Sequence, residues 1–129
     1  MKVHLIEDEA VAAEALQLFV QVMVEDVQII HRTTGSDAGR VIADEKPDVV
    51  LLDIELPGED GFSILRKIRT FSDVPVIMVT ADVSEETAIR CLMAGADDYV
   101  RKPFAGAELL ARMTAILLRS EPRPTDAYG

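Results

Sequence analysis

Short apolar runs alternate along the chain with longer segments in which apolar side chains recur every three or four residues. The runs are β-branched or aliphatic without polar alternation, and they fall at residues 3–6, 27–30, 49–52, 76–79 and, more weakly, 98–100. Runs of this kind are typical of strands that are covered on both faces. The pattern therefore predicts five buried strands.

The segments between the runs are predicted to be amphipathic helices at residues 12–24, 37–45, 61–71, 85–94 and 107–118. The first helix is expected to turn Ala15, Leu18, Phe19 and Val22 toward the core, and the third Phe62, Leu65 and Ile68, with Arg66, Lys67 and Arg69 pointing outward. A strand–helix pair repeated five times predicts an α/β fold with a parallel sheet and helices on both faces. Ligands of such sheets bind beyond the carboxyl ends of the strands, so functional residues are expected just after each run.

The length of the chain, 129 residues, and its hydrophobic fraction, 49%, are sufficient for one domain with a single core. We assign residues 1–119 to this domain. Residues 120–129 contain two prolines and show no periodicity, which predicts a linker or a disordered tail.

The charge and the cysteine count narrow the class of protein. A net charge of −10 repels nucleic-acid phosphates, so the domain itself is not expected to bind DNA or RNA. The lone cysteine, Cys91, cannot form an internal disulfide, which fits a reducing compartment. No stretch resembles a signal peptide, and no apolar run approaches the roughly 20 residues that span a bilayer. We therefore expect a soluble cytoplasmic protein without a membrane partner.

Polar residues of a particular kind follow the predicted strands. Glu7 and Asp8 come after the first run, Asp53 ends the third, Thr80 ends the fourth, and Lys102 follows the fifth. Three carboxylates that meet at one edge of a sheet repel one another unless a hard divalent cation lies between them, and oxygen ligands favour magnesium or manganese over zinc. An acidic cluster with a lysine and a hydroxyl nearby is what phosphoryl transfer to a carboxylate requires.

Four sequence strings carry a family resemblance. LIEDE at 5–9, VVLLDIELPGEDGF at 49–62, VIMVTA at 76–81 and GADDYVRKPF at 95–104 together resemble the signature of response-regulator receiver domains. The resemblance covers about residues 2–119. It implies a doubly wound, flavodoxin-like sheet of five parallel strands in the order 2-1-3-4-5. It also implies a two-component signalling domain that takes a phosphoryl group from a sensor histidine kinase in the presence of Mg²⁺, with Mn²⁺ as a possible substitute, and that catalyses only its own phosphorylation and dephosphorylation.

The resemblance assigns roles position by position. For phosphoryl transfer, Asp53 matches the phosphorylated aspartate, Lys102 matches the ammonium that contacts the phosphoryl group, and Pro103 matches a proline preceded by a cis peptide bond. For metal binding, Asp8 and Asp53 match direct ligands, Glu7 matches an acid that binds the metal through water, and Glu55 matches the residue that offers its backbone carbonyl to the metal. Thr80 matches the switch hydroxyl and Tyr99 matches the switch aromatic residue.

The string GADDYVRKPFAGAELLARM is similar to the class of receivers that carry a C-terminal DNA-binding domain, the OmpR/PhoB type. This similarity implies transcriptional control through a domain that is absent here. It also implies a phosphorylation-promoted homodimer through the fourth helix, fifth strand and fifth helix, with Asp97, Asp98, Glu108 and Arg112 as candidate contact residues. Ala88 stands where that class has a basic residue on the fourth helix.

Three alternatives remain open. The chain could be a stand-alone receiver that acts by protein–protein contact or in a phosphorelay. It could be a phosphatase of the haloacid-dehalogenase type, but that family has a second aspartate two residues after the nucleophile, where Glu55 stands. A degenerate, metal-independent receiver is the third alternative, and the retention of Asp8, Asp53, Thr80 and Lys102 argues against it.

Overall fold

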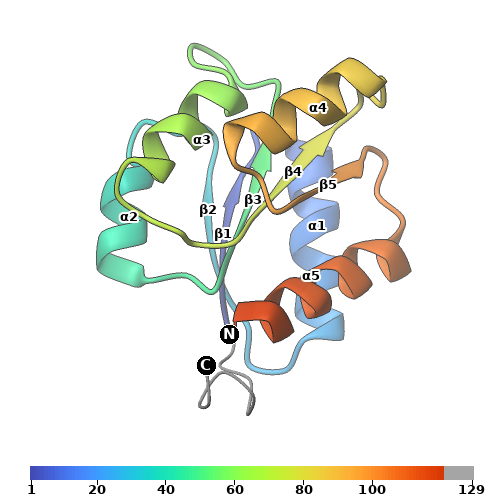
Figure 1. Cartoon of the computed structure of the whole chain (residues 1–129). Helices are drawn as coiled ribbons and strands as arrows, with labels where there is room; N and C mark the ends of the chain where they lie inside the picture. Colours follow the sequence, from blue (N-terminus) through green and yellow to red (C-terminus); the bar gives the residue numbers. More distant parts are fainter. Residues whose placement is uncertain (121–129) are drawn as a thin grey trace, which may run out of the picture.

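The computed structural model describes residues 1–120 and consists of five strand–helix pairs (Figure 1). In chain order they are β1 (Lys2–Ile6), α1 (Ala10–Met23), β2 (Gln28–Arg32), α2 (Ala38–Glu45), β3 (Val49–Asp53), α3 (Gly61–Arg69), β4 (Val76–Thr80), α4 (Glu85–Ala94), β5 (Asp98–Arg101) and α5 (Gly106–Ser120). Ser120 still belongs to α5, and the remainder of the predicted linker or tail lies outside the described residues. Across residues 1–120, no helix is both long enough and apolar enough to cross a membrane.

The five strands form one parallel sheet in the order β2-β1-β3-β4-β5, so the expected doubly wound architecture is confirmed. The register aligns Ile6 with Leu52, Asp53 with Val79, and Thr80 with Arg101. The carboxyl ends of β1, β3, β4 and β5 therefore meet at one edge of the sheet.

Two hydrophobic cores lie on opposite faces of the sheet. On one face, α2, α3 and α4 pack against strand residues that include Val50 and Leu52; on the other, α1 and α5 pack against Val49 and Leu51 (Figure 1). Alternate residues of β3 thus enter opposite cores, and all five residues of this strand are buried. Burial on both faces explains why the strand reads as an unbroken apolar run.

The predicted core face of α1 was wrong for Ala15, Leu18 and Val22, which are exposed, whereas Phe19 is partly buried and packs against the core as expected. Leu18 is 60% exposed and Val22 is 73% exposed, whereas Ala13, Leu16 and Val20 are buried. This helix carries apolar residues around most of its circumference, so more than one stripe satisfies a helical period.

The predicted core face of α3 is confirmed for Phe62, Leu65 and Ile68, but Arg69 does not point freely into solvent. Its side chain is only 19% exposed and donates hydrogen bonds to the carbonyls of Gly95, Ser72 and Val74. The guanidinium also lies 3.0 Å from the carboxylate of Asp97. Arg69 therefore ties the end of α3 to the segments that precede β4 and β5.

Candidate functional site

Three carboxylates converge at the carboxyl edge of the sheet. Glu7 and Asp8 follow β1, and Asp53 is the last residue of the neighbouring strand β3. One carboxylate oxygen from each residue lies within 4.8 Å of the other two. Glu7 and Asp53 are buried, at 1% and 3% exposure, while Asp8 is exposed. The cluster is therefore open to solvent on the side of Asp8.

A lysine that is distant in sequence, Lys102, also enters this cluster. The Nζ of Lys102 lies 3.2 Å from Oδ2 of Asp53, contacts Oε1 of Glu7 and lies 3.8 Å from Oε2 of Glu9. Lys102 follows β5, its backbone N–H donates to the carbonyl of Thr80 at 2.8 Å, and its peptide bond to Pro103 is cis. The ammonium is thus shared between the two buried carboxylates.

Burial and the neighbouring charges shift the pKa values of Glu7 and Lys102. Burial, followed by the interaction with Asp53, raises the pKa of Glu7 to about 8, although Lys102 opposes the shift. Burial lowers the pKa of Lys102, but the hydrogen bond to Glu7 and the charge of Asp53 outweigh it, so its net pKa is raised. The site therefore holds a firmly protonated ammonium, Lys102, beside Glu7, a carboxyl group that does not ionise easily.

The residues present fit a hard divalent cation. Oε2 of Glu7 is buried and accepts no hydrogen bond from any residue of the described part of the chain. Three clustered carboxylates, two of them buried and one exposed, match the ligand preference of Mg²⁺ or Mn²⁺. A cation there would favour the ionised form of Glu7 and so oppose the burial and the interaction with Asp53 that raise its pKa.

The turn after β3 approaches the backbone of Asp53 closely. The N–H of Glu55 donates to Oδ1 of Asp53 at 3.2 Å, and the N–H of Gly61 donates to the carbonyl of Ile54 at 2.7 Å. A Cβ on Gly61 would lie 2.3 Å from the carbonyl oxygen of Asp53, so only glycine fits this position. Asp60 then caps α3, because its Oδ1 accepts a hydrogen bond from the N–H of Ser63 at 2.9 Å.

Thr80 and Tyr99 lie on β4 and β5, the two strands that follow β3 across the sheet. Thr80 is fully buried, and its Oγ1 accepts a hydrogen bond from the N–H of Asp82 at 2.9 Å. Tyr99 is half-buried and packs against the core of α2, α3 and α4. It also lines a hollow of about 320 Å³ together with Val83 and Pro103.

The candidate dimer residues are paired within the chain. Arg112 lies 2.8 Å from Asp98 and 3.1 Å from Glu108, and Asp97 lies 3.0 Å from Arg69. Asp97 also accepts a hydrogen bond from the N–H of Val76 at 2.8 Å. Asp97 therefore has a structural role inside the domain that the sequence did not indicate.

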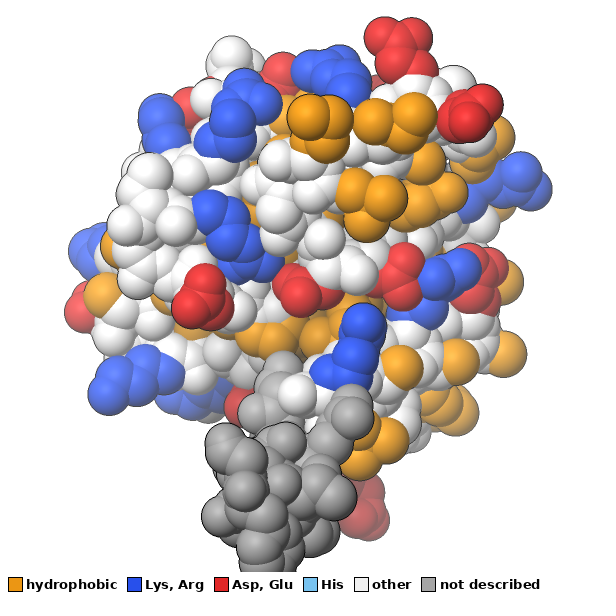
Figure 2. Space-filling model, in the orientation of Figure 1, with side chains coloured by type: hydrophobic (Ala, Val, Ile, Leu, Met, Phe, Trp, Pro, Cys, Tyr) orange, Lys and Arg blue, Asp and Glu red, His pale blue; other side chains and the backbone are white. Residues whose placement is uncertain are grey.

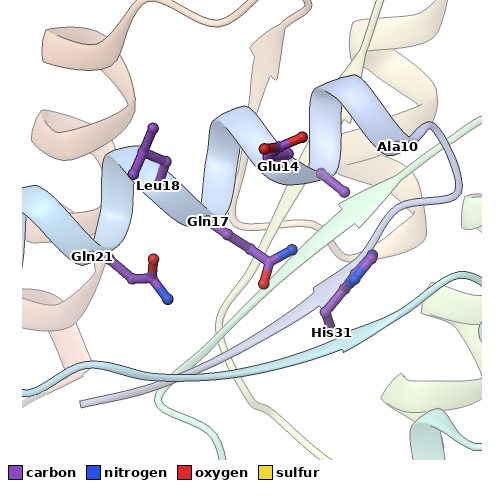
Figure 3. A pocket seen from close by; sticks show the side chains of 7 residues that line it. Ala10, Glu14, Gln17, Leu18, Gln21 and His31 are labelled. Carbon is purple, nitrogen blue, oxygen red and sulfur yellow. The ribbon is translucent and has the colours of Figure 1, made fainter.

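Sequence reasoning also missed a contact between β2 and the acidic turn. The Nε2–H of His31 donates to the carbonyl of Glu7 at 2.9 Å, and the N–H of Glu7 donates to the carbonyl of Arg32 at 3.0 Å. Figure 3 shows His31 pointing toward the start of α1, across a hollow of about 400 Å³ that Gln17 and Gln21 also line. The only signal was the position of His31 near the carboxyl end of the strand next to β1.

Comparisons with known proteins agree with this arrangement. The family model described as the response regulator receiver domain matches residues 3–114. The BeF₃-activated N-terminal receiver domain of RstA from Klebsiella pneumoniae is 35% identical, with a TM-score of 0.83 over 91% of this chain and 98% of that one. A two-component response regulator from Clostridium difficile is 26% identical, with a TM-score of 0.86 over 95% and 99%. The receiver domain of a sensor histidine kinase from Pseudomonas aeruginosa, solved with magnesium in its active-site cleft, is 29% identical, with a TM-score of 0.81 over 90% and 96%.

Proposed function

This chain belongs to the response regulator receiver domain family, and from that membership we propose that Asp53 accepts a phosphoryl group from a sensor histidine kinase. A receiver is a signalling domain of two-component systems and not a classical enzyme. The observation that carries the proposal is the buried carboxylate of Asp53, which lies against an ammonium and two further acids at an edge that is open beside Asp8.

In the proposed transfer, an oxygen of Asp53 attacks the phosphorus of the donor phosphohistidine. A new O–P bond forms while the N–P bond breaks, and the imidazole nitrogen leaves with the electron pair. Lys102 neutralises charge on the phosphoryl oxygens, and the N–H of Glu55 holds Oδ1 of Asp53 in place. The domain thus positions and stabilises charge, which is the larger part of phosphoryl-transfer catalysis.

We propose that Mg²⁺, or Mn²⁺ in its place, binds at this edge. Asp8 and Asp53 would hold it directly, Glu7 through water, and Glu55 through its backbone carbonyl. When bound, the cation supplies positive charge to the phosphoryl oxygens and to the three acids. The buried Oε2 of Glu7, which accepts no hydrogen bond from residues 1–120, and the magnesium in the Pseudomonas aeruginosa receiver support this assignment.

Phosphorylation is proposed to shift a population between two states of the domain. The hydroxyl of Thr80 would move toward the phosphoryl group, and Tyr99 would turn inward behind it. Thr80 ends β4, one residue past the partner of Asp53 in the sheet register, and Tyr99 lies on the next strand, β5, opposite Met78. The surface formed by α4, β5 and α5 would change as a result.

For the output we propose transcriptional control of the OmpR/PhoB type, with a DNA-binding domain that follows the described residues and a homodimer formed through α4, β5 and α5. The similarity to RstA at 35% identity supports this subfamily. Ile89, Leu92 and Met93 are exposed at 49%, 64% and 84%, and Figure 2 shows hydrophobic side chains gathered over α4. Exposed apolar groups in one patch are typical of a protein interaction surface.

Intact-mass spectrometry after incubation with acetyl phosphate and Mg²⁺ tests the proposal. The native chain should gain the mass of one phosphoryl group only when the cation is present, and Asp53→Asn should gain none. Asp44→Asn is the matched control, because Asp44 is an exposed aspartate on α2. Modification that persists in Asp53→Asn would overturn the assignment, and repeated turnover of phosphate monoesters would favour the phosphatase alternative.

A further inference from the structure

The turn between β4 and α4 contains a continuous set of hydrogen bonds that starts at Thr80. Oγ1 of Thr80 accepts from the N–H of Asp82 at 2.9 Å. Oδ1 of Asp82 accepts from the N–H of Ser84 at 2.9 Å, and Oδ2 accepts from the hydroxyl of Thr87 at 2.7 Å. Oγ of Ser84 in turn accepts from the N–H of Thr87 at 3.2 Å. Thr80 is therefore joined through Asp82 to the first turn of α4.

The carboxylate of Asp82 is committed to this turn. Both of its oxygens accept hydrogen bonds from α4 or the residue that caps it, and the hydrogen bond from Thr87 is the main reason that the pKa of Asp82 is held below its usual value. The side chain is therefore ionised and oriented toward the helix. Its backbone N–H, at the same time, fixes the hydroxyl of Thr80.

Few residues of α4 are buried in the domain. Its buried residues are Thr87 and Cys91, whereas α3 buries five residues. The guanidinium of Arg90 lies 4.2 Å above the ring of Phe62 and adds one contact to α3. Because Thr87 is one of two buried anchors, a change in its hydrogen bond should alter where α4 sits.

We propose that Asp82 and Thr87 are positioning residues that hold Thr80 and α4 together in the unphosphorylated state. A movement of the Thr80 hydroxyl toward Asp53 must stretch its bond to Asp82, and Asp82 is the residue that grips the first turn of α4. Because the hydrogen bonds of Asp82 to Thr80 and Thr87 are made only in the unphosphorylated state, they stabilise that state, and their loss favours the activated state. Removal of the Thr87 hydroxyl should therefore free Thr80 and favour the activated state. This inference rests on the proposed function of Asp53 and Thr80.

The test is the apparent affinity of the whole chain for beryllofluoride in the presence of Mg²⁺, followed by NMR. Thr87→Val keeps the shape of the side chain but removes its hydroxyl. One lost hydrogen bond, about 1 kcal/mol, should tighten the apparent affinity about fivefold, and it should speed amide exchange in the first turn of α4. Thr87→Ser, which keeps a hydroxyl, should match the native chain.

Thr70→Val is the matched control, because the Thr70 hydroxyl donates to the carbonyl of Lys67 at 2.6 Å at the far end of α3. This variant should bind beryllofluoride as the native chain does. Asp82→Ala should act in the same direction as Thr87→Val, and the double variant should exceed neither single one, since both break the same link. This pair keeps the test valid if one variant folds poorly.

Unchanged or weaker binding by Thr87→Val and Asp82→Ala would overturn the inference while the native chain still binds the probe. A native chain that binds no beryllofluoride with Mg²⁺ would overturn the proposed function itself, and this inference with it. General damage to the fold lowers the affinity for the probe, so a gain in affinity separates positioning from a merely structural role.

Discussion

The ammonium of Lys102 lies 3.2 Å from Oδ2 of Asp53, although 49 residues separate them in the chain. The same ammonium contacts Glu7, so the positive charge of Lys102 lies between two carboxylates that are almost fully buried. Buried acids without a counter-charge are costly. Lys102 therefore stabilises the domain in addition to any role in phosphoryl transfer.

Replacement of Lys102 by methionine should lower the free energy of unfolding of the metal-free domain by about 3 kcal/mol, because Glu7 and Asp53 lose their shared counter-charge. Added Mg²⁺ should restore a large part of the loss, since it binds the folded state at the same acids. Urea unfolding with and without Mg²⁺ measures both effects. Lys67→Met is the control: this lysine is 71% exposed and should cost less than about 1 kcal/mol. Equal losses for the two variants would contradict the prediction.

A second prediction concerns the cation. Asp8→Asn should weaken Mg²⁺ binding about tenfold or more, because an amide oxygen carries no charge to offset that of the ion. Glu9→Gln is the matched control, since Glu9 is the next residue, is 63% exposed and lies outside the three-carboxylate cluster. Calorimetric titration with Mg²⁺ measures both affinities. If the two variants bind Mg²⁺ equally well, Asp8 is not a ligand.

Much of the fold could be predicted because strands that are buried on both faces form continuous apolar runs in the sequence. Both ends of each of the five apolar runs fall within two residues of the corresponding ends of an observed strand. The observed α4 has the same first and last residues as the helix predicted at residues 85–94. The face of α1 could not be predicted, because Leu18 and Val22 are as apolar as Leu16 and Val20. Only the position of the neighbouring α5 and sheet decides which stripe is buried.

In the candidate site, too, some residues could be predicted from the sequence and others could not. Glu7, Asp8, Asp53 and Lys102 follow strands, and the topology alone brings strand ends to one edge. The supporting contacts depend on tertiary placement. The hydrogen bond from His31 to the carbonyl of Glu7 requires β2 to lie beside β1, and an isolated histidine carries no mark of this role.

A third prediction concerns Gly61, whose missing side chain lets α3 start against the backbone of Asp53. Gly61→Ala should destabilise the domain by about 2–3 kcal/mol, because its Cβ would lie 2.3 Å from the Asp53 carbonyl oxygen and 2.8 Å from Cα of Ile54. Gly39→Ala places the same methyl group in α2, where the nearest atom is 3.5 Å away on Phe71. This control should be neutral or gain about 0.5–1 kcal/mol. Thermal unfolding compares the two, and a tolerated Gly61→Ala would contradict the proposed fit.

A fourth prediction concerns pH. His4 is fully buried in β1, and burial lowers its pKa below 6.5, although its hydrogen bond to the carbonyl of Ile30 and the charge of Asp37 oppose the shift. Arg32 and His31 add to the lowering. Above pH 6.5 the imidazole is neutral in both states, so its full contribution to stability is present there. As the pH falls from 6.5 toward the lower folded pKa, the unfolded chain binds a proton that the folded chain does not, and stability is lost.

The slope from this one group reaches at most about 1.4 kcal/mol per pH unit. Urea unfolding of the native chain and of His4→Leu at several pH values between 5 and 8 isolates it, since the other titrating groups are common to both chains and cancel in the difference. The native chain should lose stability more steeply on acidification. Parallel curves would show that His4 titrates alike in the folded and unfolded chain.

The last prediction separates two kinds of acid near β5. Asp97 accepts hydrogen bonds from Arg69 and from the N–H of Val76, so Asp97→Ala leaves two donors unpaired and should cost about 1–3 kcal/mol of stability. Arg112 is 39% exposed and pairs with Asp98 and Glu108 near the surface, so Arg112→Ala should cost less than about 1 kcal/mol. If α4, β5 and α5 form the dimer face, the two substitutions should rank in the opposite order in their effect on dimerisation. With Mg²⁺ and beryllofluoride present, light scattering should show that Arg112→Ala weakens the dimer about tenfold, equivalent to about 1.4 kcal/mol, while Asp97→Ala leaves the dissociation constant of the dimer unchanged. An Asp97→Ala variant that is stable but fails to associate would instead restore Asp97 to the interface, and its pairing with Arg69 would then have to break on activation.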